Sequence, residues 1–138
     1  VNPDAQGARW DFVASSMSIV LRYYREHAPQ FSALIYTAHT DQHVRNLRWI
    51  GCARPTHLYP LRLSRELLIK LRSRPTTGMQ VLYLLDRLGR RDVSIFGFDW
   101  KTTPTFYHTS AGKDPHNYRG ERELAASLID KNGWRLVQ

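Results

Sequence analysis

The stretch from residue 77 to residue 98 constrains the fold more tightly than any other part of this 138-residue chain. Its first half repeats apolar side chains at helical spacing, which predicts an amphipathic helix over 77–88. The inward face of that helix is expected to carry Met79, Leu82, Leu85 and Leu88. The following run, Val93 to Phe98, is apolar almost throughout, as is typical of a parallel strand covered on both faces. A helix followed by such a strand indicates an α/β protein.

Further predicted elements continue the alternation of strands and helices. Extended apolar runs predict strands at 10–15, 31–38 and 134–137. Apolar residues at helical spacing predict helices at 17–27, 41–50, 61–72 and 118–131. Ser64 is a candidate N-cap within the third of these helices, and Asn132-Gly133 is the candidate C-cap of the last. Loops are predicted at 53–60, which contains two prolines, and at 101–115, which is polar.

The alternation predicts a parallel sheet flanked by helices, a Rossmann-like α/β fold. The length indicates a single domain, 1–138, and the start at Val1-Asn2-Pro3 suggests that it is a partial one. Ligands of such sheets bind beyond the carboxyl ends of the strands. The site is therefore expected at Gly97-Phe98-Asp99 and the loop that follows.

Composition narrows the function classes. Hydrophobic residues make up 42% of the chain, enough for a core, and Cys52 is the only cysteine. One cysteine excludes an internal disulfide and a zinc site built on several cysteines, and it fits a reducing compartment. The six histidines show no metal-ligand spacing, and no apolar stretch approaches the roughly 20 residues of a transmembrane helix. The net charge of +8 would suit either nucleic acid or a phosphate-bearing substrate near an anionic membrane.

The tripeptide Thr76-Thr77-Gly78 is the first candidate for chemistry, because it lies where the predicted helix begins. Backbone N–H groups and the positive end of the helix dipole attract a phosphate there, and glycine permits close approach. A plain helix N-cap explains the same residues. Gly97 could likewise allow a ligand to approach the backbone, or simply end the strand in a turn.

Two histidines and a glutamate are the candidates for proton transfer. His116 could accept a proton from a sugar hydroxyl, and Glu121 could orient it or belong to the first turn of a helix. His108 could hydrogen-bond a phosphate leaving group, or be a solvated loop residue. Capping roles for His116 and Glu121 are the structural alternative.

Taken in order, these segments resemble the motifs of glycosyltransferase family 29, the sialyltransferases. Pro75-Thr76-Thr77-Gly78, continuing to Phe96-Gly97-Phe98, resembles the small sialylmotif. Phe106-Tyr107-His108 is loosely similar to the short aromatic and histidine motif that comes next, and His116 with Glu121 matches the last motif. Asn2, with Gly7 and Trp10-Asp11-Phe12, looks like the second half of the large sialylmotif, whose first half is absent.

The resemblance implies a metal-independent inverting transferase that uses a CMP-activated acidic sugar as its donor substrate and needs no cofactor. His116 would then be the general base, and His108 would stabilise the departing phosphate. Thr76, Thr77 and Gly78 would bind the CMP phosphate. The remaining nucleotide contacts would come from Asn2, Arg74, Gly97 and Phe98. The acceptor would be a glycan or a lipid-linked glycan.

One departure from the family concerns cysteine. Animal members join the large and small motifs by a disulfide, and this chain has no cysteine near the small motif. A bacterial, cytoplasmic enzyme at the inner face of the membrane is therefore expected, with sialic acid or Kdo as the transferred sugar. The arginine-rich segment 62–74 suggests peripheral membrane contact.

Two other classes of function stay open. A basic nucleic-acid-binding module would explain the charge, but no nucleic-acid motif is present and no specific nucleic-acid partner is expected. A non-catalytic α/β interaction domain is the third hypothesis.

Overall fold

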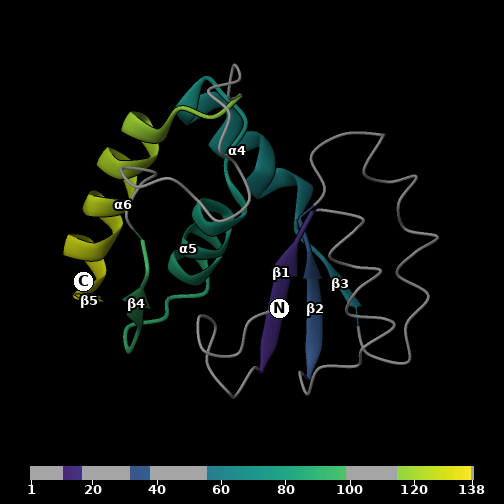
Figure 1. Cartoon of the computed structure of the whole chain (residues 1–138), viewed down its shortest axis with the longest axis horizontal. Coiled ribbons are helices and arrows are strands. Elements are labelled where there is room, and N and C mark those ends of the chain that lie inside the picture. Colours follow the sequence, from purple (N-terminus) through teal and green to yellow (C-terminus); the bar gives the residue numbers. More distant parts are fainter. Residues whose placement is uncertain (1–10, 17–31, 38–55, 99–114, 138) are drawn as a thin grey trace. The chain divides into compact units, whose positions relative to one another are not determined.

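The computed structural model describes residues 11–16, 32–37, 56–98 and 115–137. The chain divides into two compact units, 1–61 and 62–138, and each is described by itself. Both contain parallel strands, and the second also contains helices, so the expected α/β class with parallel sheets is confirmed (Figure 1).

The first unit contains a three-stranded parallel sheet (Figure 1). Its strands are β1 (Phe12–Ser15), β2 (Ala33–Tyr36) and β3 (Thr56–Leu58), in the order β1-β2-β3. Ala33, Leu34 and Tyr36 of the central strand are buried, and because successive side chains of a strand point to opposite faces, β2 has buried side chains on both of its faces.

The strands predicted at 10–15 and 31–38 are confirmed by β1 and β2. The loop predicted at 53–60 is wrong in its middle, where β3 pairs with β2. The three residues of β3 give too short a pattern to recognise in the sequence, and an edge strand tolerates prolines such as Pro55 and Pro60 beside it. The helices predicted at 17–27 and 41–50 lie outside the described residues.

The second unit is built on a strand–helix–strand crossover. Its elements are α4 (Leu61–Leu71), which begins at the boundary between the units, α5 (Thr77–Arg87), β4 (Ser94–Phe96), α6 (Tyr118–Asn132) and β5 (Arg135–Val137). Strands β4 and β5 pair in parallel, with Ile95 opposite Leu136, and α6 lies between them in the chain. The predicted helices at 61–72, 77–88 and 118–131 and the strands at 93–98 and 134–137 are therefore confirmed, with small shifts at their ends.

The core of the second unit lies among its three helices and β4. Its buried members come from every one of these elements, and Trp134, just before β5, closes it: they are Leu67, Leu71, Met79, Leu82, Tyr83, Ile95, Ala125, Leu128 and Trp134. The Trp134 ring nitrogen donates to the carbonyl oxygen of Arg90 at 2.7 Å, which satisfies its only polar atom. Gly133 ends α6 in the left-handed conformation with φ 67°, as the predicted C-cap requires.

Three details of the sequence prediction are wrong. Ser64 lies inside α4 and is buried, so it is not an N-cap. Leu88 is 61% exposed, because it comes after the last turn of α5, and Tyr83 is buried on the core side of that helix. Strand β4 is not covered on both faces, because Ile95 is buried whereas the next residue, Phe96, is 66% exposed.

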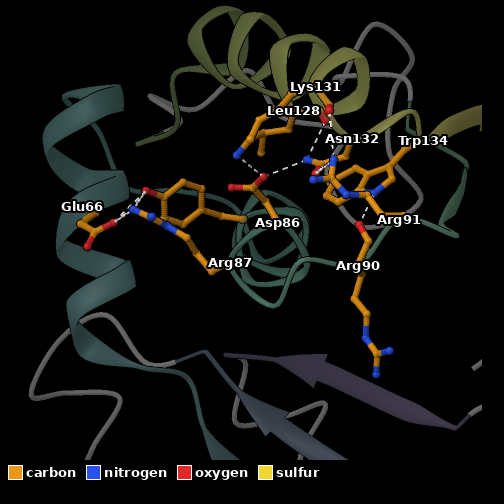
Figure 2. Close-up of polar contacts among 10 residues, drawn as sticks. Glu66, Asp86, Arg87, Arg90, Arg91, Leu128, Lys131, Asn132 and Trp134 are labelled. Carbon is orange, nitrogen blue, oxygen red and sulfur yellow. Dashed lines mark hydrogen bonds and ion pairs between the residues drawn. The ribbon is translucent and has the colours of Figure 1, made fainter.

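A polar network around Glu66 holds α4 against α5 (Figure 2). The Glu66 carboxylate accepts hydrogen bonds from the Tyr83 hydroxyl at 2.8 Å and from the Arg87 guanidinium, and Arg62 donates to its other oxygen. The bonds from Tyr83 and Arg87 lower the pKa of Glu66. The Tyr83 ring is buried in the core, and the Arg87 guanidinium lies over it, while the Tyr83 hydroxyl belongs to the polar network.

A second network around Asp86 joins the C-terminal ends of α5 and α6 (Figure 2). One Asp86 oxygen accepts from the Lys131 ammonium at 2.7 Å and from the Asn132 side-chain amide at 2.8 Å. Asn132 also accepts from Arg91 and donates to the carbonyl of Leu128, so the network reaches the loop before β4. Burial alone would raise the pKa of Asp86, but the bonds from Lys131 and Asn132 outweigh it and hold that pKa below its ordinary value.

The packing of α4 gives a matched pair for testing the core. Leu67 is fully buried and its neighbour Leu68 is 48% exposed. We expect Leu67→Ala to lower the free energy of unfolding by about 2–5 kcal/mol, because it leaves a cavity. Leu68→Ala should change it by about 0.5 kcal/mol or less. Urea denaturation measures both, and equal losses would contradict the placement of α4.

The Asp86 network predicts a dependence of stability on pH. A carboxylate with a lowered folded-state pKa stabilises the fold above its unfolded pKa of about 4, and this contribution disappears as the pH falls through the folded value. We expect Asp86→Asn to lower the free energy of unfolding at neutral pH. Its difference from the wild type should shrink as the pH falls below the unfolded pKa and through the lowered folded-state pKa. Urea denaturation across this range is the measurement, with the exposed Asp130→Asn as control. A difference that stays constant with pH would contradict it.

Candidate functional site

The candidate site is centred on the N-terminus of α5. Thr76 is the N-cap, and its side-chain oxygen accepts from the Met79 N–H at 3.1 Å. Its carbonyl accepts the first helical hydrogen bond, from Gln80. The N–H groups of Thr77 and Gly78 belong to the first turn of the helix. The positive end of the helix dipole lies at the same place.

Glu121 in the first turn of α6 binds this helix start directly. Its side chain is buried, with the whole residue only 1% exposed. One carboxylate oxygen accepts from the Thr76 backbone N–H at 2.6 Å and the other from the Thr76 hydroxyl at 2.7 Å. Glu121 therefore belongs to the first turn of α6, one of the two roles considered for it, and its carboxylate binds Thr76.

His116 is held against the segment between α4 and α5. Its Nδ1 lies 2.7 Å from the carbonyl oxygen of Arg74. Because a carbonyl oxygen only accepts, Nδ1 carries the proton in this contact, and the neutral ring then has its lone pair on Nε2. The Tyr118 ring lies at 5.8 Å from the His116 ring, measured between centroids. The contact thus fixes the tautomer that a general base acting through Nε2 needs.

Asn117 holds the loop before α6 in place on both sides. Its side-chain oxygen accepts from the Gly120 N–H at 3.0 Å, which caps α6. Its side-chain amide donates to the carbonyl of Leu71, and its backbone N–H donates to the Ser73 hydroxyl. Sequence reasoning missed Asn117 as a site residue, although an asparagine directly before a helix is a typical N-cap signal. Nothing in the sequence near Asn117 predicts its hydrogen bonds to Leu71 and Ser73, which lie more than 40 residues away.

Phe98 packs on Gly78 and brings the end of β4 to the same place. A Cβ atom at position 78 would lie only 2.7 Å from Cζ and 2.9 Å from Cε1 of the Phe98 ring. Only glycine therefore allows this contact without a shift of the ring. Gly97 has φ 69°, a left-handed conformation that favours glycine, and it turns the chain between β4 and Phe98.

The structure brings most of the predicted site residues to one end of the second unit. The contacts join Arg74, Thr76, Gly78, Phe98, His116 and Glu121, and Thr77 and Gly97 lie next to members of this group. Asn2 and His108 lie outside the described residues. Three segments that are far apart in sequence, 74–78, 97–98 and 116–121, therefore meet at the start of α5.

Among the described residues, no group of three or more His, Cys, Asp or Glu side chains could hold a metal ion. Within the same part of the chain, no helix has the length and apolar character needed to cross a membrane.

Comparisons with protein-family models, with curated proteins and with solved structures find no match to this chain.

The double contact between Thr76 and Glu121 predicts an energetic coupling. Thr76→Val removes the hydroxyl, and Glu121→Gln replaces one acceptor oxygen by an amide. We expect each change to lower the free energy of unfolding by about 1–3 kcal/mol, because a buried polar partner is lost. The double variant should lose less than the sum, with a coupling of about 1 kcal/mol or more.

The exposed pair Arg119–Glu123 on α6 is the matched control for this cycle. Its members lie four residues apart in one helix and are largely in solvent, so its coupling should be about 0.5 kcal/mol or less. Additive losses at Thr76 and Glu121 in urea denaturation would contradict the contact.

Proposed function

We propose that this chain is part of a CMP-sugar-dependent glycosyltransferase that moves an acidic sugar, sialic acid or Kdo, to a glycan hydroxyl with inversion. The observation that carries the proposal is the meeting of segments 74–78, 97–98 and 116–121 at the N-terminus of α5. These are the segments that resemble the sialyltransferase motifs. The proposed transfer needs a binding site for the donor phosphate and a proton-accepting histidine close together, and these segments provide candidates for both.

The phosphate of CMP would bind at the start of α5. Thr77 and Gly78 supply first-turn N–H groups and the positive end of the helix dipole. Thr76 plays a different part, because its hydroxyl proton and its N–H are both donated to Glu121. Thr76 and Glu121 are then positioning residues that hold the phosphate-binding turn in place. The exposed Arg74 adds a positive charge next to this turn.

His116 would act as the general base. The acceptor hydroxyl gives its proton to Nε2 while its oxygen attacks the anomeric carbon of the sugar, and the bond from that carbon to the CMP oxygen breaks. Attack on the face opposite the leaving group inverts the configuration. The Arg74 carbonyl keeps Nδ1 protonated throughout and can stabilise the cationic ring that forms. His108 would stabilise the departing phosphate, as the resemblance implies.

Calorimetric titration with CMP, without metal, tests the nucleotide site. We expect saturable binding to the wild type that exceeds binding of a neutral sugar, and roughly tenfold weaker binding to Gly78→Ala, since the new methyl group displaces Phe98 or the helix start. His116→Ala should bind CMP as the wild type does, yet release no CMP from CMP-sialic acid or CMP-Kdo in the presence of acceptor.

Arg119→Ala, on the exposed surface of α6, is the control for both assays and should leave binding and transfer unchanged. The proposal fails if CMP binds no better than the neutral sugar both to this chain and to a form extended at the N-terminus. It also fails if His116→Ala keeps its transfer rate.

A further inference from the structure

Helix α4 presents an apolar and basic stripe to solvent. Arg65, Leu68 and Ile69 are spaced at i, i+3 and i+4, which places them on one side of the helix, and Arg72 directly follows the last residue of α4 with a left-handed φ of 51°; we call these four residues the α4 stripe. The buried side of α4 carries instead Ser64, Leu67 and Leu71. Leu68 is 48% exposed and Ile69 is 76% exposed. The stripe therefore has two exposed aliphatic side chains, with the exposed Arg65 one turn before them and the exposed Arg72 just after the end of the helix.

The charge of the described residues around the stripe is positive. Lys70 adds a further cation beside it. Glu66 is the only acidic residue of α4, and its carboxylate is bound by Tyr83, Arg87 and Arg62. Within the part of the chain that the structure describes, Arg65, Lys70 and Arg72 form no ion pair. The stripe thus joins apolar surface to a local excess of positive charge.

We propose that the α4 stripe binds the surface of an anionic lipid bilayer. Aliphatic side chains gain from insertion at the boundary between headgroups and acyl chains, while arginines extend their long side chains outward to lipid phosphates. Basic residues near such a surface also gain from its negative potential. An acidic surface without an apolar layer, such as a nucleic-acid backbone, would not explain Leu68 and Ile69, because binding there rests on charge and on aromatic stacking.

Helix α4 is suited to lie along such a surface. Its 11 residues span about 16 Å, far too short to cross a bilayer, and its opposite side is fixed in the core by Leu67 and Leu71. Binding therefore needs no unfolding of the helix. The inference is independent of the transfer chemistry proposed above.

Co-sedimentation of the full chain with lipid vesicles tests the inference. We expect binding to vesicles of an equimolar mixture of phosphatidylglycerol and phosphatidylcholine, and none to pure phosphatidylcholine. Arg65→Gln with Arg72→Gln should weaken binding roughly 25-fold, at about fivefold for each cation removed. Leu68→Ser with Ile69→Ser, which keeps the charge, should weaken it roughly tenfold.

The matched control is Arg90→Gln with Arg135→Gln, which removes two exposed cations elsewhere in the second unit and should change binding by roughly twofold or less. Far-ultraviolet circular dichroism and thermal unfolding check that each variant folds. If the double serine variant does not, the single Ile69→Gln, at the more exposed position, takes its place.

Three results would overturn the inference. The first is no binding to the anionic vesicles. The second is that the charge-preserving serine variant binds vesicles as tightly as the wild type, or that Arg90→Gln with Arg135→Gln weakens binding as much as Arg65→Gln with Arg72→Gln. Either result would mean that binding rests on general charge attraction. The third is salt-dependent binding of a short RNA that is lost in Arg65→Gln with Arg72→Gln while vesicles stay unbound, which would assign the stripe to nucleic acid instead.

Discussion

The contact between Glu121 and Thr76 is the interaction on which the arrangement of the second unit depends. It joins the first turn of α6 to the N-cap of α5 across 45 residues of sequence. The carboxylate is buried, so its charge requires the two donors that Thr76 provides. Those donors in turn are available because Thr76 is in an extended conformation at the cap and has not entered the helix. The Glu121 side chain thus links the N-cap of α5 to the packing of α6.

The two helices are tied at their other ends as well. Asp86 accepts from Lys131 and Asn132 near the C-termini of α5 and α6. On the other side of α5, Arg87 and Tyr83 bind Glu66 of α4. Charged pairs with partly buried acceptors hold α5 in register with both neighbours, while the shared apolar core supplies most of the burial. The first turn of α5 is therefore fixed as a consequence of contacts along the whole helix.

Much of the second unit could be predicted from the sequence because its signals are local. Thr76, the apolar spacing of 77–88 and the C-cap at Gly133 each act within a few residues, and the structure confirms those elements. The partner of Glu121 could not be predicted in this way, because nothing near position 121 points to position 76.

Burial was harder to predict than secondary structure. Phe96 and Leu88 are apolar yet exposed, because β4 is covered on one face and α5 ends before position 88. Tyr83 is polar at one end yet buried, because Glu66 and Arg87 receive its hydroxyl. Strand β3 forms through pairing with β2, which outweighs the loop signal of the two nearby prolines. Segments 74–78, 97–98 and 116–121 were named as site candidates from a family resemblance, and their meeting at the start of α5 is seen only in the structure.

The contacts at both ends of segment 99–114 have a consequence for how the chain can vary. Before it, the Phe98 ring is packed on Gly78; after it, His116 and Asn117 are bonded to the backbone of Arg74 and the hydroxyl of Ser73. A connection whose two ends are anchored independently can change in length at a small entropic cost, about 0.6 kcal/mol for each doubling. Insertions and deletions between Asp99 and Asp114 should therefore leave the turn at the start of α5 in place.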